Sequence, residues 1–182
     1  MLLVQLMLAL QLLFPGRAAK ESYLVVRGER ITVKAATSMG NINCTYSSSR
    51  QGDTLYINRQ VTRGEGLMLR LPVKAFGCGN LLLTRDFQRT LKAGDYPLVK
   101  VEMLELVQEG QQLKGTLRLQ LAGKAQVLRG VNFSSHAGNK LSTMLCLSFS
   151  DFELATPNKL GGLVKVEEEM QVNVELLLAH LQ

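Results

Sequence analysis

The stretch "LVKVEMLELVQEGQQLKGTLRLQL", residues 98–121, decides the fold class of this 182-residue chain. Val99, Val101 and Met103 alternate with Lys100 and Glu102. After the polar segment "QEGQQ", leucines at positions 113, 117, 119 and 121 lie among polar residues in the same way. A period of two places the apolar side chains on one face of a strand. The stretch therefore predicts two antiparallel strands, each with one buried face, joined by a short turn.

The same alternation continues on both sides of this stretch. Towards the N-terminus we predict strands in "SYLVV", "DTLYINRQV" and "GLMLRLPVKAF", and one bent strand or two short ones, with Gly40 at a bend or bulge, in "ITVKAATSMGNINCTYSS". Towards the C-terminus strands are predicted in "AQVLRGVNF", "NKLSTMLCLSF" and "EEEMQVNVELLL". About eight such strands can close into a barrel, which removes exposed sheet edges. The predicted fold class is all-β.

One segment breaks the pattern, "NLLLTRDFQRTLKAGDYP" at residues 80–97. Thr84 suits a helix N-cap, and Asp86 in the first turn suits the positive end of the helix dipole. Phe87 and Leu91 share a helical face, and Gly94 suits the left-handed position after the last turn. The segment predicts one short helix that packs Phe87 and Leu91 over an opening of the barrel.

The adjacent charges Arg85 and Asp86 allow two interpretations. They can be exposed charges at the start of the helix, or the corner of an active site. Catalysis would need a nucleophile, a histidine or a second carboxylate beside them, and the sequence places none there. We therefore predict that the protein is not an enzyme and that it needs no cofactor.

The N-terminus predicts export. The apolar run Leu2–Phe14 is followed by the small residues Gly16 and Ala18, which suit a signal-peptidase site, although the basic residues that usually open such a peptide are missing. We expect a signal peptide at residues 1–19, with cleavage within 18–20, a barrel domain at 20–182 and a periplasmic or secreted location. A buried core segment is the alternative. The run is too short to cross a bilayer comfortably, so no integral membrane segment is expected after cleavage.

Three cysteines are present, and an exported chain favours a disulfide. Cys44 and Cys78 lie beside turn residues at the ends of predicted strands, so these two are the expected pair. Cys146 has apolar neighbours and is expected to be buried. No metal site is predicted, because short-spaced Cys or His pairs are absent and His136 and His180 stand apart.

The net charge of +6 is spread along the chain, and aromatic residues make up only 5%. Nucleic-acid binding normally requires a concentrated basic patch, so a nucleic-acid partner is not expected.

Two segments carry a resemblance to a known family. The first is "RDF…L…YP" within residues 80–104. The second is "SFSDFELATPNKLGGLVKVEEEMQVNVELLL", residues 148–178, with Phe149, Asp151, Phe152, Pro157, Gly162, Lys165 and Val166 at its characteristic positions. Together they resemble the YceI-like family, loosely from Tyr23 to Leu178. Two features depart from the family pattern: "MGNINCTYSSSRQGD" replaces its opening strands and a wider loop, and the pair Cys44 and Cys78 is not part of it.

The resemblance implies a lipocalin-like antiparallel barrel, exported by bacteria, that holds a polyisoprenoid-type chain. Buried hydrocarbon is stabilised by about 0.8 kcal/mol per CH₂ group. The residues expected to line the ligand site are Leu69, Leu71, Val73, Val101, Met103, Leu117, Leu119, Leu145, Leu147, Val172 and Val174. A barrel filled by its own side chains, acting as a structural or interaction protein of the cell envelope, is the alternative. The oligomeric state stays open.

Overall fold

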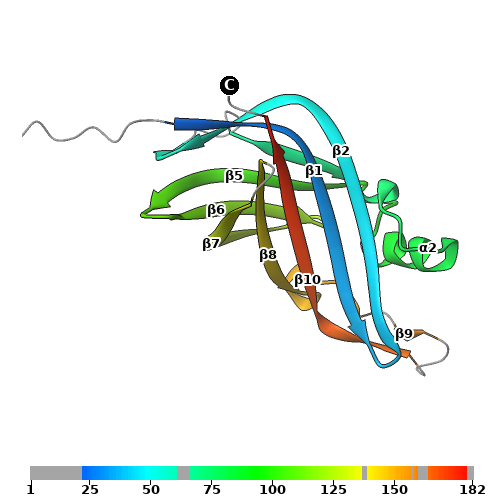
Figure 1. The fold of residues 1–182 in the computed structure, drawn as a ribbon. Helices are drawn as coiled ribbons and strands as arrows, with labels where there is room; N and C mark the ends of the chain where they lie inside the picture. Colours follow the sequence, from blue (N-terminus) through cyan, green and yellow to red (C-terminus); the bar gives the residue numbers. More distant parts are fainter. Residues whose placement is uncertain (1–21, 61–65, 137–138, 157, 160–163, 180–182) are drawn as a thin grey trace, which may run out of the picture.

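The strands predicted from alternation form one antiparallel sheet that bends round on itself (Figure 1). The computed structural model describes residues 22–60, 66–136, 139–156, 158–159 and 164–179. The expected signal peptide, residues 1–19, lies outside these described residues. The strands are β1 (Ser22–Thr37), β2 (Gly40–Ile57), β3 (Arg59–Gln60), β4 (Met68–Pro72), β5 (Leu98–Glu109), β6 (Gln112–Leu121), β7 (Lys124–His136), β8 (Lys140–Ser148), β9 (Asn158–Lys159) and β10 (Val164–Leu178). The helical elements are η2 (Val73–Ala75), α2 (Leu81–Thr90) and η3 (Ser150–Phe152).

The order of hydrogen-bonded strands nearly closes the barrel. Neighbours follow the order β2-β1-β10-β8-β7-β6-β5-β3, with β4 also paired to β5 and β9 to β10. Asn58 joins β2 to β3, and its backbone N–H donates to the Leu106 carbonyl of β5 at 2.7 Å. Its side-chain Oδ1 accepts from the N–H of Gln108 at 2.9 Å. The sheet thus returns to its first strand, and the predicted lipocalin-like all-β barrel with a short helix is confirmed.

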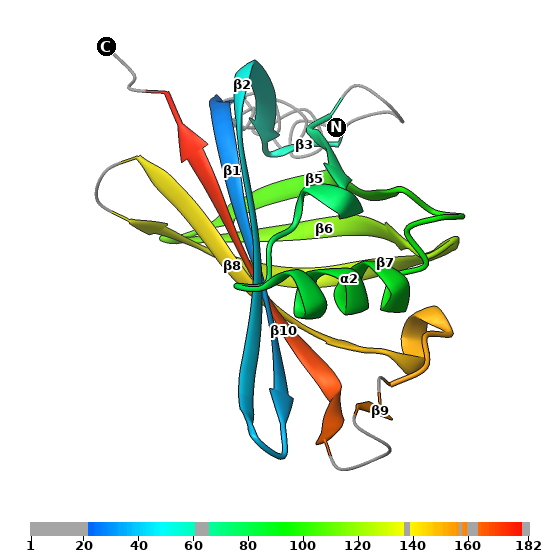
Figure 2. The same cartoon turned by 90° about the vertical axis from the view of Figure 1, so that its right-hand side faces the viewer.

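Two groups of strands cross at a steep angle (Figure 2). β1, β2, β8 and β10 form one group, and β5, β6 and β7 form the other. The groups meet at the corner between β7 and β8, where the described register pairs Ser134 with Ser142, Ser135 with Leu141 and His136 with Lys140. In Figure 2 the helix α2 lies in front of the strands. The inner faces of both groups supply the hydrophobic core.

The N-terminal third differs from the prediction. "SYLVV" and "ITVKAAT" belong to one strand, β1, and the predicted strand "GNINCTYSS" continues through "SRQGD" into "TLYI" to form β2. The divider is a tight turn at Ser38 and Met39, in which the Thr37 hydroxyl accepts from the N–H of Met39 and donates to the carbonyl of Gly40. Gly40 has φ +117°, which side-chain-bearing residues rarely adopt. The polar stretches "RGER" and "SRQGD" lie inside β1 and β2, so the two strands are longer than predicted and their pairing spans Ser22–Thr37.

The strand predicted in "GLMLRLPVKAF" ends early. Leu67, Leu69 and Leu71 are buried as the alternation predicts, but β4 stops at Pro72 and the turn η2 follows. Proline lacks the N–H that would continue a ladder. As a result Phe76, and not Ala75, is the next buried residue after Val73.

The expected burial of Cys146 is wrong. Leu145 and Leu147 are buried on the inner face of β8, so the period of two turns the intervening Cys146 outward, where it is exposed. The apolar neighbours of Cys146 suggested burial, whereas the alternation along β8 places its side chain on the outer face. Cys44 and Cys78 form the expected disulfide.

This placement predicts selective labelling of the folded protein. Iodoacetamide should alkylate Cys146 without denaturant, because its thiol is exposed. Cys44 and Cys78 should become reactive only after reduction. Peptide mass spectrometry locates the label, and a Cys146→Ser variant is the control that should take up none before reduction. Protection of Cys146 until unfolding would show that β8 faces the other way.

Candidate functional site: an apolar cavity in the barrel

The barrel encloses a narrow apolar cavity. Its volume is about 80 Å³. Its walls come from both strand groups and from α2. The lining residues are Ile31, Val33, Leu67, Leu69, Leu71, Phe76, Phe87, Leu91, Val99, Val101, Met103, Leu117, Leu119, Leu121, Phe133, Thr143, Leu145, Leu147, Met170, Val172, Val174 and Leu176.

Of the residues predicted to line the ligand site, all except Val73 line this cavity. Val73 is fully buried, but η2 turns its side chain into the core beside the cavity. Ile31 and Val33 of β1 also line the cavity and were not predicted to do so, although they alternate with polar residues in the sequence. Phe76 and Phe133 line it as well and were not predicted either. Phe133 lies across the inward position of Gly115, where an added Cβ would stand 2.7 Å from the ring, a tertiary contact without a local sequence signal.

The helix that covers one end begins earlier than predicted. Its N-cap is Asn80, whose Oδ1 accepts from the N–H of Leu83 at 2.8 Å. Thr84 lies inside the helix, where its hydroxyl donates to the Asn80 carbonyl. The left-handed residue near the C-terminal end is Lys92, with φ +52°, and not Gly94. The predicted Thr84 cap is wrong, because Asn80 caps the helix four residues earlier and lengthens it by a turn. The predicted stop at Gly94 is also wrong, because Lys92 takes the left-handed conformation instead.

The inner face of α2 closes the cavity with aromatic and aliphatic side chains. Phe87 and Leu91 line the cavity, as expected. The ring of Phe87 lies 5.4 Å from that of Phe76, which in turn stacks on Tyr46 at 5.4 Å. A second, smaller cavity of about 50 Å³ lies on the other side of Phe87 and Leu91, next to Phe149. These side chains therefore separate the barrel interior from a recess beneath α2.

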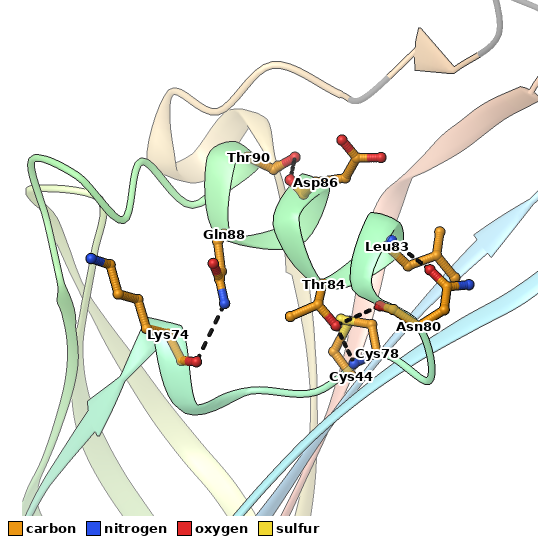
Figure 3. The surroundings of a disulfide bond; sticks show 9 residues. All are labelled: Cys44, Lys74, Cys78, Asn80, Leu83, Thr84, Asp86, Gln88 and Thr90. Atoms are coloured by element: carbon orange, nitrogen blue, oxygen red, sulfur yellow. Dashed lines mark hydrogen bonds between the residues drawn. A yellow bond between two sulfur atoms is a disulfide. The ribbon is translucent and has the colours of Figure 1, made fainter.

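The disulfide fixes α2 to the barrel (Figure 3). Cys44 belongs to β2, and Cys78 precedes α2. Next to the disulfide, Thr45 and Gly77 exchange two backbone hydrogen bonds of 2.9 and 3.0 Å. The N–H of Cys78 donates to the hydroxyl of Thr84 at 3.0 Å. Closing a loop across a sequence separation of 34 stabilises a fold by about 4 kcal/mol in the chain-entropy model.

The charges of α2 show a structural arrangement. Arg85 is exposed, and Asp86 pairs with Arg89 at 3.5 Å instead of with Arg85. This arrangement agrees with the interpretation of Arg85 and Asp86 as helix charges. Within the described residues no group of three or more His, Cys, Asp and Glu side chains could hold a metal ion. Of the described helices, none combines the length and apolarity needed to cross a bilayer.

Two carboxylates, those of Glu168 and Glu153, connect the segment around η3 to neighbouring strands and residues. Glu168 of β10 accepts from the N–H of Ser150 at 2.7 Å and from the hydroxyl of Thr156 at 2.8 Å. The bond from Ser150 is the main cause that lowers the pKa of Glu168, and the Thr156 bond adds to it. Glu153 forms an ion pair with Lys124 of β7 at 2.6 Å, which lowers the pKa of Glu153. Phe152, fully buried, is the apolar anchor of the same segment.

Known proteins share this fold at low sequence identity. The chain is similar to BcnA of Burkholderia cenocepacia, with 17% identity, 80% of this chain and 94% of that chain covered, and a TM-score of 0.54. It is similar to a polyisoprenoid-binding domain from Saccharophagus degradans implicated in plant cell wall breakdown, with 13% identity, 85% and 95% coverage and a TM-score of 0.60. A Campylobacter jejuni YceI protein aligns at 14% identity, with 86% and 85% coverage and a TM-score of 0.47. Neither a family model nor a curated protein matches the chain. The expected YceI-like resemblance is confirmed as a likeness of fold.

One face of α2 packs on the barrel and the other is exposed, so substitutions on the two faces should differ in their effect on the free energy of unfolding. Phe87→Ala should lower the free energy of unfolding by about 2–3 kcal/mol, because a half-buried ring in contact with Phe76 is lost. Arg85→Ala, on the exposed face of the same helix, should change it by about 0.5 kcal/mol or less. Urea unfolding followed by circular dichroism measures both. Equal effects would show that α2 does not pack on the barrel.

The hydrogen bonds to Glu168 predict a pH dependence. A carboxyl group whose pKa is lowered by folding stabilises the fold fully above its unfolded-state pKa, and this stabilisation is lost as the pH falls through the folded-state value. Glu168→Gln should therefore lower the urea midpoint at neutral pH and leave it nearly unchanged at about pH 2. The exposed neighbour Glu167, changed to Gln, is the control. A Glu168→Gln effect that is the same at both pH values would contradict the assignment.

Proposed function

We propose that this chain binds a long apolar chain, of the polyisoprenoid type, inside the barrel and carries it without chemical change. The observation that supports this most strongly is the cavity itself, whose wall is aliphatic and aromatic apart from Thr143. Its residues come from strands far apart in the sequence, so the fold as a whole keeps the space open. The named polyisoprenoid-binding domain with the same fold supports the ligand class.

The wall is suited to a flexible hydrocarbon. Met103 and Met170 lie on it, and unbranched thioether side chains adapt to irregular partners. The chain contains no tryptophan, the residue that would most readily plug the axis of a small barrel. Each buried CH₂ group of the ligand would contribute about 0.8 kcal/mol, so affinity grows with chain length and needs no charged anchor.

Export is part of the proposal. The Cys44–Cys78 disulfide requires an oxidising compartment, which the periplasm or the extracellular space provides. The N-terminal leader pattern at residues 1–19 agrees with this. A lipid carrier in such a compartment would shield an apolar chain from water between membranes or between a membrane and an enzyme.

The proposal predicts that filling the cavity blocks binding. Leu119→Trp places a large ring inside the barrel and should weaken binding of geranylgeraniol by about tenfold or more. Gln120→Trp, at the adjacent outward position of β6, should bind as the wild type does. Displacement of a fluorescent apolar probe measures the affinity, and circular dichroism verifies the fold. If the wild type binds no long-chain lipid and Leu119→Trp unfolds the barrel, the interior is solid and the alternative of a structural or interaction protein holds.

A further inference from the structure

One polar side chain faces the apolar cavity. Thr143 lies on β8 between the inward-facing Leu141 and Leu145, and only 5% of it is exposed. It lines the cavity, yet its Oγ1 is buried without a hydrogen-bond partner among the described residues. A buried hydroxyl normally finds a partner, because leaving one unsatisfied is unfavourable. As the side chain stands, its oxygen exposes no surface to the cavity, so a ligand would meet it only after rotation about χ1.

The surroundings of Thr143 explain why the protein supplies no partner. Its register partner on β10 is Val174, whose partner on β1 is Ile31, so the same face carries only aliphatic groups on that side. On the other side, Ser142 makes the last described pair with β7, and the ladder ends just before Thr143. Rotation about χ1 exchanges the hydroxyl with the methyl group of Thr143, so the oxygen can be turned towards a ligand.

We propose that the hydroxyl of Thr143 forms a hydrogen bond to an uncharged oxygen of the bound chain, a hydroxyl, carbonyl or ether group. This deepens the proposed lipid binding and rests on it. The ligand class is a long apolar chain with one buried neutral oxygen, not a plain hydrocarbon.

Charge excludes a buried phosphate as the group that meets Thr143. None of the described lining residues is basic, so a phosphate there would have no counter-charge. Two residues before Ile31 on β1, Glu29 pairs with the inward-facing Leu176 of β10 and is fully buried. A carboxyl group at this level adds no positive charge. A neutral oxygen, which needs only a single donor or acceptor, fits the site.

The proposal is tested with two probes that differ by one atom. Geranylgeraniol carries a hydroxyl, and its deoxy hydrocarbon carries a hydrogen in that place. Thr143→Val keeps the shape of the side chain and removes its hydrogen-bonding oxygen. We expect it to weaken geranylgeraniol binding by about five- to tenfold and to leave the hydrocarbon unaffected. Thr143→Ser retains the hydroxyl and should retain the preference for geranylgeraniol.

The ligand-free protein gives an independent readout. Because Thr143→Val removes a buried hydroxyl without a partner, its thermal unfolding midpoint should equal or exceed that of the wild type. A lowered midpoint would reveal a structural partner for the hydroxyl and overturn the proposal. Equal losses for both probes, or no loss for either, would also overturn it while lipid binding stands. If the wild type binds neither probe, the proposed function fails as well.

Discussion

The two-residue period of the strands is the constraint on which this structure depends. A residue that faces inward on one strand meets inward-facing residues on both neighbours, so one misplaced polar residue would disturb three strands. The register illustrates this, since Val172 lies between Val33 of β1 and Leu145 of β8. The sheet then closes on itself through Asn58 at the start of β3. The cavity wall built in this way is apolar except for Thr143, and its free space depends on side-chain size.

The helix and the disulfide convert this barrel into a closed container at one end. Without the Cys44–Cys78 link and the adjacent Thr45–Gly77 bridge, the connection between β4 and α2 would lie on β2 through side-chain packing alone. With them, Phe87 and Leu91 are held across the interior. The recess beneath α2 shares these two residues, and also Val33 and Met170, with the main cavity. The disulfide therefore fixes the helix whose side chains line both spaces.

Much of this arrangement could be predicted from the sequence, for identifiable reasons. Alternation revealed the strands and most of the inward residues, and the turn positions of Cys44 and Cys78 indicated their pairing. The full lengths of β1 and β2 were missed because the polar stretches "RGER" and "SRQGD" inside them give no apolar signal. The N-cap at Asn80 was missed because Thr84, four residues later, is also of a capping type. Thr143 has no local signal at all, since its significance comes from Val174 and Ile31 on other strands.

The central claim is that the interior is a binding site for a chain lipid rather than a filled core. Mass spectrometry of an organic extract of the protein, purified from its natural compartment without detergent, tests this most directly. The account predicts a long-chain lipid with a single neutral oxygen, present in nearly equimolar amount and lost from Leu119→Trp. A protein that carries no lipid, and takes up none from lipid vesicles, would contradict it.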